Sequence, residues 1–99
     1  MQPKNVQSLE GVIKTLHGCD SVHVGSEQVH ELFQGMTAWQ GTVEIFDLIG
    51  HPKAKRAYAW SFKDGETIKS VAVLEIPPVD SPQSAVKVAI AAKARQRQN

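Results

Sequence analysis

The chain has 99 residues, of which 41% are hydrophobic and 21% charged, and its formal net charge is +1 at pH 7. This composition is typical of a small soluble globular domain and excludes a disordered chain, while the near-neutral charge argues against a dedicated DNA- or RNA-binding protein, which would be strongly basic. No apolar run approaches the roughly 20 residues of a membrane span, and the length predicts one domain over residues 1–99.

The first predicted element is a helix over residues 5–17, in the segment NVQSLEGVIKTLH. Its apolar residues recur with the spacing that places them on one side of a helix. They are Val6, Leu9, Val12, Ile13 and Leu16. Gly18 follows them and suits the C-terminal cap, where a positive φ is common. We therefore expect one apolar stripe and a helix that ends at this glycine.

Four strand-like segments follow, because from Asp20 the apolar residues alternate along the chain instead of recurring every third or fourth position. The first segment is interrupted at Gly25-Ser26, where a bulge or bend is expected. The later segments are rich in β-branched and aromatic residues. The segments read DSVHVGSEQVHELF, WQGTVEIFDLI, KRAYAWSF and TIKSVAVLEI, and the last is stopped by Pro77-Pro78.

The turns between these segments predict how the strands pair. A two-residue turn at Asp64-Gly65 and a loop over residues 50–53 together fix the later registers. The predicted pairs are Trp60 with Lys69, Tyr58 with Val71, Ile45 with Tyr58, and Asp47 with Arg56. If Gly35-Met36 closes the first hairpin, His30 and Leu32 lie on the same face as the tryptophans. A slip of one residue in a loop would reverse such an assignment.

A second helix is predicted after the proline-rich stop. Ser81 is a favourable N-cap, and Pro82 suits the first helical position. Asp80 places a negative charge at the positive end of the helix dipole. Residues 94–99 are expected to fray into solvent as a tail.

The predicted fold class is therefore α+β, a four-stranded antiparallel meander with an N-terminal and a C-terminal helix (α-β-β-β-β-α). One face of the sheet is small and aliphatic, with alanines at positions 57, 59 and 72. Alanine lets a helix axis approach a sheet closely. We therefore expect both helices to pack on this one face.

The opposite face is aromatic and strongly apolar, and it would then lack a cover. Exposed apolar surface costs about 25 cal/mol per Å², and large apolar patches usually mark an interface. A second copy, in a two-fold symmetric homodimer, is the simplest partner. The leading interpretation is thus a non-enzymatic binding or interaction protein that self-associates and needs no cofactor. The interface residues expected on this face are Trp39, Val43, Ile45, Tyr58, Trp60, Val71, Val73 and His30.

Two other functions stay open. The first is a small-molecule-binding protein or enzyme with a mostly apolar pocket near Trp39, Trp60 and His30. The second is a nucleic-acid-binding module, because the stretch GHPKAKRAYAWSF interleaves basic and aromatic side chains. Its candidate residues are Lys53, Lys55, Arg56 and Lys69. A pairing of Arg56 with Asp47 would reduce the charge available for phosphate, and DSPQSAVK at the second helix lacks the lysines typical of double-stranded-RNA-binding domains.

Metal and thiol chemistry are weaker interpretations. The segment HGCDSVH and the following strand hold several potential ligands, namely His17, Cys19, Asp20, His23 and His30. A structural zinc site usually has paired ligands at regular short spacing, which this segment lacks. Cys19 cannot form an internal disulfide and is expected to be buried. With no signal peptide evident, a cytoplasmic location without a membrane partner is expected.

The runs FDLIGHPKAKRAYAW and VLEIPPVDSPQSAV resemble segments of short, uncharacterised bacterial proteins of the integron or mobile gene cassette type. The resemblance covers about the last 60 residues and includes no catalytic or binding signature. It implies a small bacterial protein and assigns no site residue.

Overall fold

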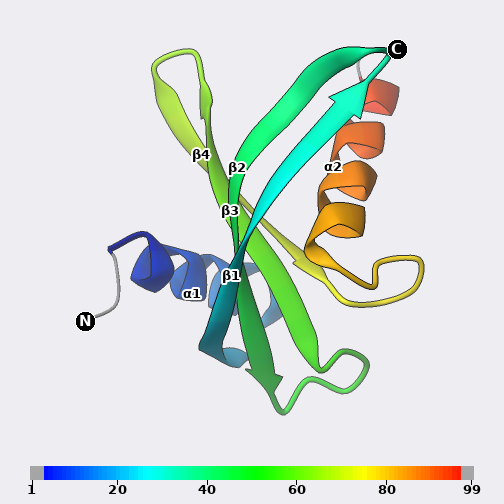
Figure 1. Cartoon of the computed structure of the whole chain (residues 1–99). Helices are drawn as coiled ribbons and strands as arrows, with labels where there is room; N and C mark the ends of the chain where they lie inside the picture. The colour runs from blue at the N-terminus through cyan, green and yellow to red at the C-terminus, as the bar shows by residue number, and fades with distance from the viewer. Residues whose placement is uncertain (1–3, 97–99) are drawn as a thin grey trace.

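The computed structural model describes residues 4–96. Within this range the elements are α1 (Lys4–His17), β1 (Asp20–Phe33), β2 (Met36–Ile49), β3 (Arg56–Asp64), β4 (Thr67–Leu74) and α2 (Pro82–Gln96) (Figure 1). The described strands form one antiparallel sheet in the order β1-β2-β3-β4. The predicted α+β class, with two helices and an antiparallel meander, is confirmed.

Helix α1 matches its predicted bounds, whereas Leu16 of the predicted stripe is 59% exposed. Its buried residues Val6, Leu9 and Ile13 lie on one stripe, as the spacing requires. Gly18 has a φ of 70°, and its N–H donates to the Lys14 carbonyl at 2.9 Å. The glycine therefore caps the helix and turns the chain into β1.

The first hairpin turns one residue earlier than predicted. Gln34 and Gly35 have φ values of 55° and 80°, and Phe33 pairs with Met36. Two consecutive positive φ values are the pattern of a type I′ turn, which matches the twist of the strands it joins. Gly35-Met36, the condition under which His30 was expected on the aromatic face, therefore does not close this hairpin.

A bulge next to this turn changes the face on which His30 lies. Between the pairs Leu32–Thr37 and Glu31–Trp39, residue 38 is an extra residue of β2. His30 pairs with Gln40, whereas its neighbour Val29 pairs with Gly41 and is buried in the aromatic cluster. Neighbouring strand residues point to opposite faces. The prediction that His30 belongs to the aromatic face is therefore wrong. The His30 ring is exposed and is hydrogen-bonded to Thr37 Oγ1 at 2.9 Å.

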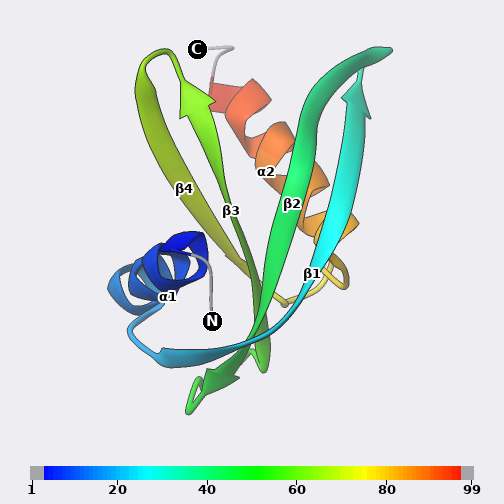
Figure 2. The ribbon, with the colours of Figure 1, turned by 60° about the vertical axis from the view of Figure 1, so that its left-hand side comes forward.

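The β1–β2 hairpin is irregular at two points. Between the pairs His23–Phe46 and Gly25–Ile45, Val24 is an extra residue of β1, so the bulge expected at this glycine is confirmed. A second irregularity follows Glu31. Bulges bend a strand and increase its twist, and both strands curve strongly along their length (Figure 2).

The β3–β4 hairpin is shifted by two residues from its prediction. Asp64 pairs with Thr67, so that Gly65 and Glu66 form the turn, and Gly65 has a φ of 66°. Glycine at the first central position is typical of a type II′ turn. Trp60 therefore pairs with Val71 and not with Lys69. Because the side-chain period is two, every residue stays on its predicted face.

The pairing between β2 and β3 follows the prediction but is short. Ile45 pairs with Tyr58 and Asp47 with Arg56, as expected, and the pairing spans Glu44–Asp47 and Arg56–Ala59. Beyond these pairs the two hairpins separate, so that β1–β2 and β3–β4 form two arms with α2 behind them (Figure 2).

The two helices cover opposite faces of the sheet, which corrects the prediction that both pack on the small-residue face. Helix α1 shares a buried cluster with Phe46, Ala57 and Ala59. Helix α2 shares another with Tyr58 and Trp60. The segment between β4 and α2 passes to the far side of the sheet (Figure 1). Alternation along the strands defines two faces, but it does not indicate which face a distant helix covers.

The aromatic face is consequently covered by the chain itself. Val43, Tyr58 and Trp60 are 0%, 2% and 3% exposed. The homodimer was predicted from the premise that this face lacks a cover, and that premise is wrong. The dimer itself stays a prediction.

Helix α2 begins as predicted and extends further than predicted. The Ser84 N–H donates to Ser81 Oγ at 3.1 Å, and the Ser81 N–H donates to Ser84 Oγ at 3.0 Å. Residues 94–96, expected to fray, continue the helix, since alanine and arginine favour helix. Residues 97–99 lie outside the described range. No helix among the described residues has the length and hydropathy needed to cross a membrane.

We predict that Tyr58 titrates far above its usual range. Burial, and then the hydrogen bond that its hydroxyl donates to the Glu75 carboxylate, raise the pKa of Tyr58 from 10.0 to about 12. Because the folded-state pKa is the higher one, the protonated phenol stabilises the fold fully below about pH 10. That contribution is lost as the pH rises to about 12. The chain has one tyrosine, so ultraviolet absorbance of tyrosinate reports this group alone.

Tyr58→Phe serves as the companion variant. It removes the hydrogen bond to Glu75, which should lower the free energy of unfolding by about 0.5–1.5 kcal/mol at neutral pH. It should also reduce the loss of stability at alkaline pH. A tyrosinate transition centred near pH 10 in the folded protein would contradict the buried phenol.

Candidate functional site

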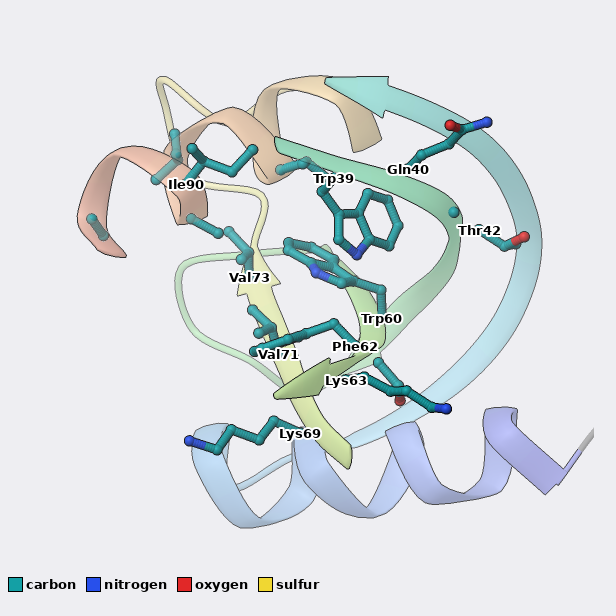
Figure 3. A pocket seen from close by; sticks show the side chains of 16 residues that line it. Trp39, Gln40, Thr42, Trp60, Phe62, Lys63, Lys69, Val71, Val73 and Ile90 are labelled. Carbon is teal, nitrogen blue, oxygen red and sulfur yellow. The ribbon is translucent and has the colours of Figure 1, made fainter. Parts of the chain in front are cut away.

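A cleft of about 920 Å³ lies between the two hairpin arms. One side is the tip half of β2, with Trp39 and Thr42, and the other is formed by β3 and β4. Helix α2 closes the back of the cleft with Val86, Ala89 and Ile90. Figure 3 shows Trp39, Trp60 and Val73 directed toward a common space, whereas the polar ends of Gln40, Thr42, Lys63 and Lys69 point away from it. The cleft exists because β2 and β3 stop pairing at Glu44–Ala59 while each hairpin continues.

Both tryptophans of the chain meet in this cleft. The ring centroids of Trp39 and Trp60 are 5.8 Å apart, and the ring planes are inclined by 49°. Such tilted aromatic pairs contribute about 0.5–1.5 kcal/mol beyond the burial of their area. Trp60 is buried, whereas Trp39 is half-buried. Trp39 therefore keeps part of its indole open to a molecule in the cleft.

Gly41 makes the position of Trp39 possible. A Cβ at residue 41 would lie 2.9 Å from Cζ2 and 3.1 Å from Cη2 of the Trp39 indole. Residues 39 and 41 point to the same face of β2, so the ring folds back over the glycine toward Trp60. A glycine two residues after the tryptophan thus allows the Trp39 indole to lie where it lines the cleft.

The β4 wall changes from apolar to charged along its length. Val73, Val71 and Lys69 line the cleft in that order, two residues apart on one strand. Lys63 is the other charged side chain of the lining. Among the described residues that line the cleft, none is a histidine or a carboxylate.

Helix α2 is attached to the β1–β2 arm near its tip. The side-chain amide of Gln83 donates to the buried carboxylate of Glu31 and to the His30 carbonyl, the latter at 3.3 Å. The helix also contacts β2 and β4. Helix α2 therefore contacts both hairpin arms, and the distance between the arms depends on how this helix packs against them.

The structure brings together only part of the site that the sequence predicts. Trp39, Trp60, Val71 and Val73 line the cleft. Val43, Ile45 and Tyr58 belong to the same apolar cluster but not to the cleft lining. His30, the polar residue expected in the pocket, is exposed elsewhere.

The basic residues proposed for nucleic acid do not gather. Lys53 and Lys55 are exposed in the loop between β2 and β3, at the end of the sheet opposite the hairpin tips (Figure 1). Arg56 Nε donates to Asp47 Oδ1 at 3.1 Å, and this bond raises the pKa of Arg56 above its usual value. Lys69 lies apart on the β4 wall. The buried rings of Tyr58 and Trp60 offer no face on which bases could stack.

The potential metal ligands bind separate partners instead of one another. His17 Nε2 donates to the Ala72 carbonyl at 3.1 Å, and Lys14 pairs with Asp20 at 2.7 Å. His23 Nε2 donates to Glu44 Oε1 at 2.8 Å, and Cys19 is buried with a free thiol. Among the described residues, no three such side chains are placed to hold a metal ion.

A serine, a histidine and a carboxylate do meet on the α1 side of the sheet. Ser26 Oγ and His23 Nε2 both donate to Oε1 of the buried Glu44. The bulge at Val24 brings residues 23 and 26 to the same face. In nucleophilic catalysis the histidine lies between the other two groups, whereas here the carboxylate does. We interpret this cluster as structural: its hydrogen bonds connect β1, on both sides of the bulge, to Glu44 of β2.

Sequence reasoning missed the residues that α2 contributes, because it placed that helix on the other face. It also missed Phe62 and Lys63, which follow Trp60 on β3 and line the cleft. The Trp39–Gly41 spacing was a local signal that could have been used, since a strand glycine often marks a close approach.

Comparisons with protein-family models, with curated proteins and with solved structures find no match to this chain. The resemblance to mobile gene cassette proteins therefore stays a prediction. The function has to be inferred from the geometry of the cleft.

We predict that Gly41→Ala displaces the Trp39 indole. The added methyl group would overlap the ring edge, so the ring contact with Trp60 should be lost, at a cost of about 0.5–1.5 kcal/mol in the free energy of unfolding. Near-ultraviolet circular dichroism and tryptophan fluorescence report the change.

Gly25→Ala is the matched control in β1, because a Cβ there would meet Ile45 Cδ1 at an ordinary 3.9 Å. Its spectra should resemble those of the parent chain. If Gly41→Ala leaves the tryptophan spectra unchanged, the described position of Trp39 is wrong.

Proposed function

We propose that this chain is a non-enzymatic binding protein that holds a small, largely apolar molecule in the cleft between its two hairpin arms. The observation that carries this proposal is the cleft of about 920 Å³ at which both tryptophans meet. Ligand sites typically occupy about 300–1,000 Å³ and combine apolar walls with a few polar groups. The cleft falls within this range.

The lining supplies the interactions that binding requires. Trp39 offers a partly open indole for stacking, and Val71, Val73 and Ile90 offer apolar contact from two different elements. Gln40 and Thr42 border the cleft on the β2 side, with their polar ends directed away from it (Figure 3). Walls from β2, β3, β4 and α2 surround a ligand on several sides, which is how a compact protein buries most of a small molecule.

The test is binding of N-phenyl-1-naphthylamine, a neutral probe that becomes fluorescent in apolar sites. It should bind and quench the tryptophan emission. Val71→Glu should weaken binding by about tenfold or more, because the probe would desolvate a carboxylate.

Val24→Glu is the matched control, since Val24 is a strand valine exposed outside the cleft. It should bind the probe as the parent chain does. Absence of binding to the parent chain, or equal binding by Val71→Glu, would refute the proposal.

Self-association is a second candidate, and the observation that favours it is the apolar tip of the β1–β2 arm. Leu32 and Met36 are 55% and 74% exposed beside the turn. The arm projects from the body of the molecule (Figure 2). Burying two such side chains at a two-fold axis would contribute to a dimer without displacing α2.

Sedimentation velocity over a concentration series tests this candidate. Met36→Lys should weaken a dimer by about tenfold, while Ile68→Lys should not. Ile68 is 68% exposed at the tip of the other arm, which makes it a matched control. A parent chain that stays monomeric at every concentration would eliminate self-association.

A further inference from the structure

The edge of β2 that borders the cleft presents backbone groups beyond the end of the β2–β3 ladder. The Leu48 N–H donates to the Lys55 carbonyl at 2.8 Å, so the backbone of Leu48 points toward β3. Every second residue of a strand directs its N–H and C=O to the same side, and this series includes Thr42 and Gln40. The β2–β3 pairing ends at Glu44. Among the described residues, the backbone groups of Thr42 and Gln40 that face the cleft therefore have no ladder partner.

The two outer edges of the sheet are each obstructed by a side chain from a helix. At the β4 edge, His17 of α1 donates from Nε2 to the Ala72 carbonyl at 3.1 Å. At the β1 edge, the side-chain amide of Gln83 in α2 donates to the His30 carbonyl at 3.3 Å. A strand that approached either edge would have to displace one of these bonds. In the part of the chain that the structure describes, the β2 edge inside the cleft carries no such bond.

The two sides of this edge differ in polarity. The Trp39 side chain is directed into the cleft, whereas the polar ends of Gln40 and Thr42 point away from it (Figure 3). Val73 of β4 and Ile90 of α2 continue the apolar side. Side chains of an extended segment alternate between two faces. A segment that lies beside β2 would therefore place every second side chain against the apolar lining and the others in water.

We propose that the cleft binds an extended peptide segment, which adds to this edge of β2 as a new strand and has apolar side chains at every second position. Its backbone exchanges hydrogen bonds with Thr42 and Gln40, and its apolar side chains pack against Trp39 and Val73. This inference rests on the proposed function, because it names the ligand class for the same cleft. A hydrocarbon against this edge would remove water from the backbone groups and leave them unsatisfied, whereas a peptide replaces that water with hydrogen bonds.

The experiment uses the peptide acetyl-Lys-Val-Thr-Val-Thr-Val-amide and two isomers, one N-methylated at its first two valines and the other at its two threonines. In an extended peptide, the valine N–H groups point to one edge and the threonine N–H groups to the other. Only one edge can pair with β2, so one isomer should bind about tenfold more weakly than the other. Tryptophan fluorescence and calorimetry measure the affinities. Equal binding of the two isomers to the parent chain would refute strand addition.

Amide hydrogen exchange locates the bound peptide on the chain. The Val43 N–H points toward β1, where Val43 pairs with Glu27, whereas the Thr42 N–H faces the cleft. In the free chain the Thr42 amide should therefore exchange faster than the Val43 amide. Saturation with the unmethylated peptide should slow exchange at Thr42 by about tenfold or more. Unchanged exchange at Thr42 with the peptide bound would overturn the proposal.

Proline variants assign the effect to one edge. Thr42→Pro removes the N–H that faces the cleft and keeps the β1–β2 ladder, since proline is tolerated at a strand edge. Gln28→Pro is the matched control, because Gln28 pairs with Thr42, shares a side-chain hydrogen bond with it at 2.7 Å, and directs its N–H to the outer edge of β1. Thr42→Pro should reduce the difference between the two isomers to about threefold or less, and Gln28→Pro should keep it. An equal reduction in both variants would contradict the assignment to β2.

The naphthylamine probe distinguishes failure of this inference from failure of the proposed function. If N-phenyl-1-naphthylamine binds the parent chain and the unmethylated peptide does not, the peptide class is wrong while the cleft remains a binding site. If both bind, the peptide should displace the probe, and simultaneous binding would place the peptide outside the cleft and so refute the inference. If neither binds, the binding function itself fails together with its ligand class.

Discussion

The short pairing between β2 and β3 is the constraint on which the rest of the structure depends. Each hairpin is paired from its base to its turn, but the two hairpins share ladder contacts only over Glu44–Asp47 and Arg56–Ala59 in the part of the chain that the structure describes. Since a sheet keeps its strands about 4.8 Å apart only where they pair, the arms separate above this junction. The space between them becomes the cleft, and its walls are the strands themselves.

Helix α2 makes this open arrangement compatible with a folded protein. An interrupted sheet would leave apolar side chains in water, and their exposure would oppose folding. Ala85 and Val86 pack into one cluster with Val29 and Val43 of one arm and Tyr58 and Trp60 of the other. The helix therefore covers the aromatic face and connects the arms at once. Helix α1 closes the alanine face, so the two halves of the core lie on either side of one sheet.

Parts of the candidate site could be found from the sequence, and the reasons differ by residue. Trp39, Trp60, Val71 and Val73 were placed on one face because strand alternation is a local property, and the two-residue error in the β3–β4 turn left it unchanged. His30 was misplaced because the bulge between the pairs Leu32–Thr37 and Glu31–Trp39, which the pattern does not reveal, reverses the faces of β1 relative to Trp39. The contribution of Ile90 depends on where α2 packs, which no local spacing encodes.

The sequence by itself determined the order of the elements, the bounds of the helices to within a few residues, and the two chemically different faces of the sheet. These follow from side-chain periodicity and from the φ preferences of glycine, both of which act over a few neighbouring residues. The tertiary structure alone decided which face each helix covers, how far β2 and β3 remain paired, and that a cleft lies between the arms. Those features result from packing between segments far apart in the chain, where burial of apolar area selects among arrangements that the local pattern allows equally.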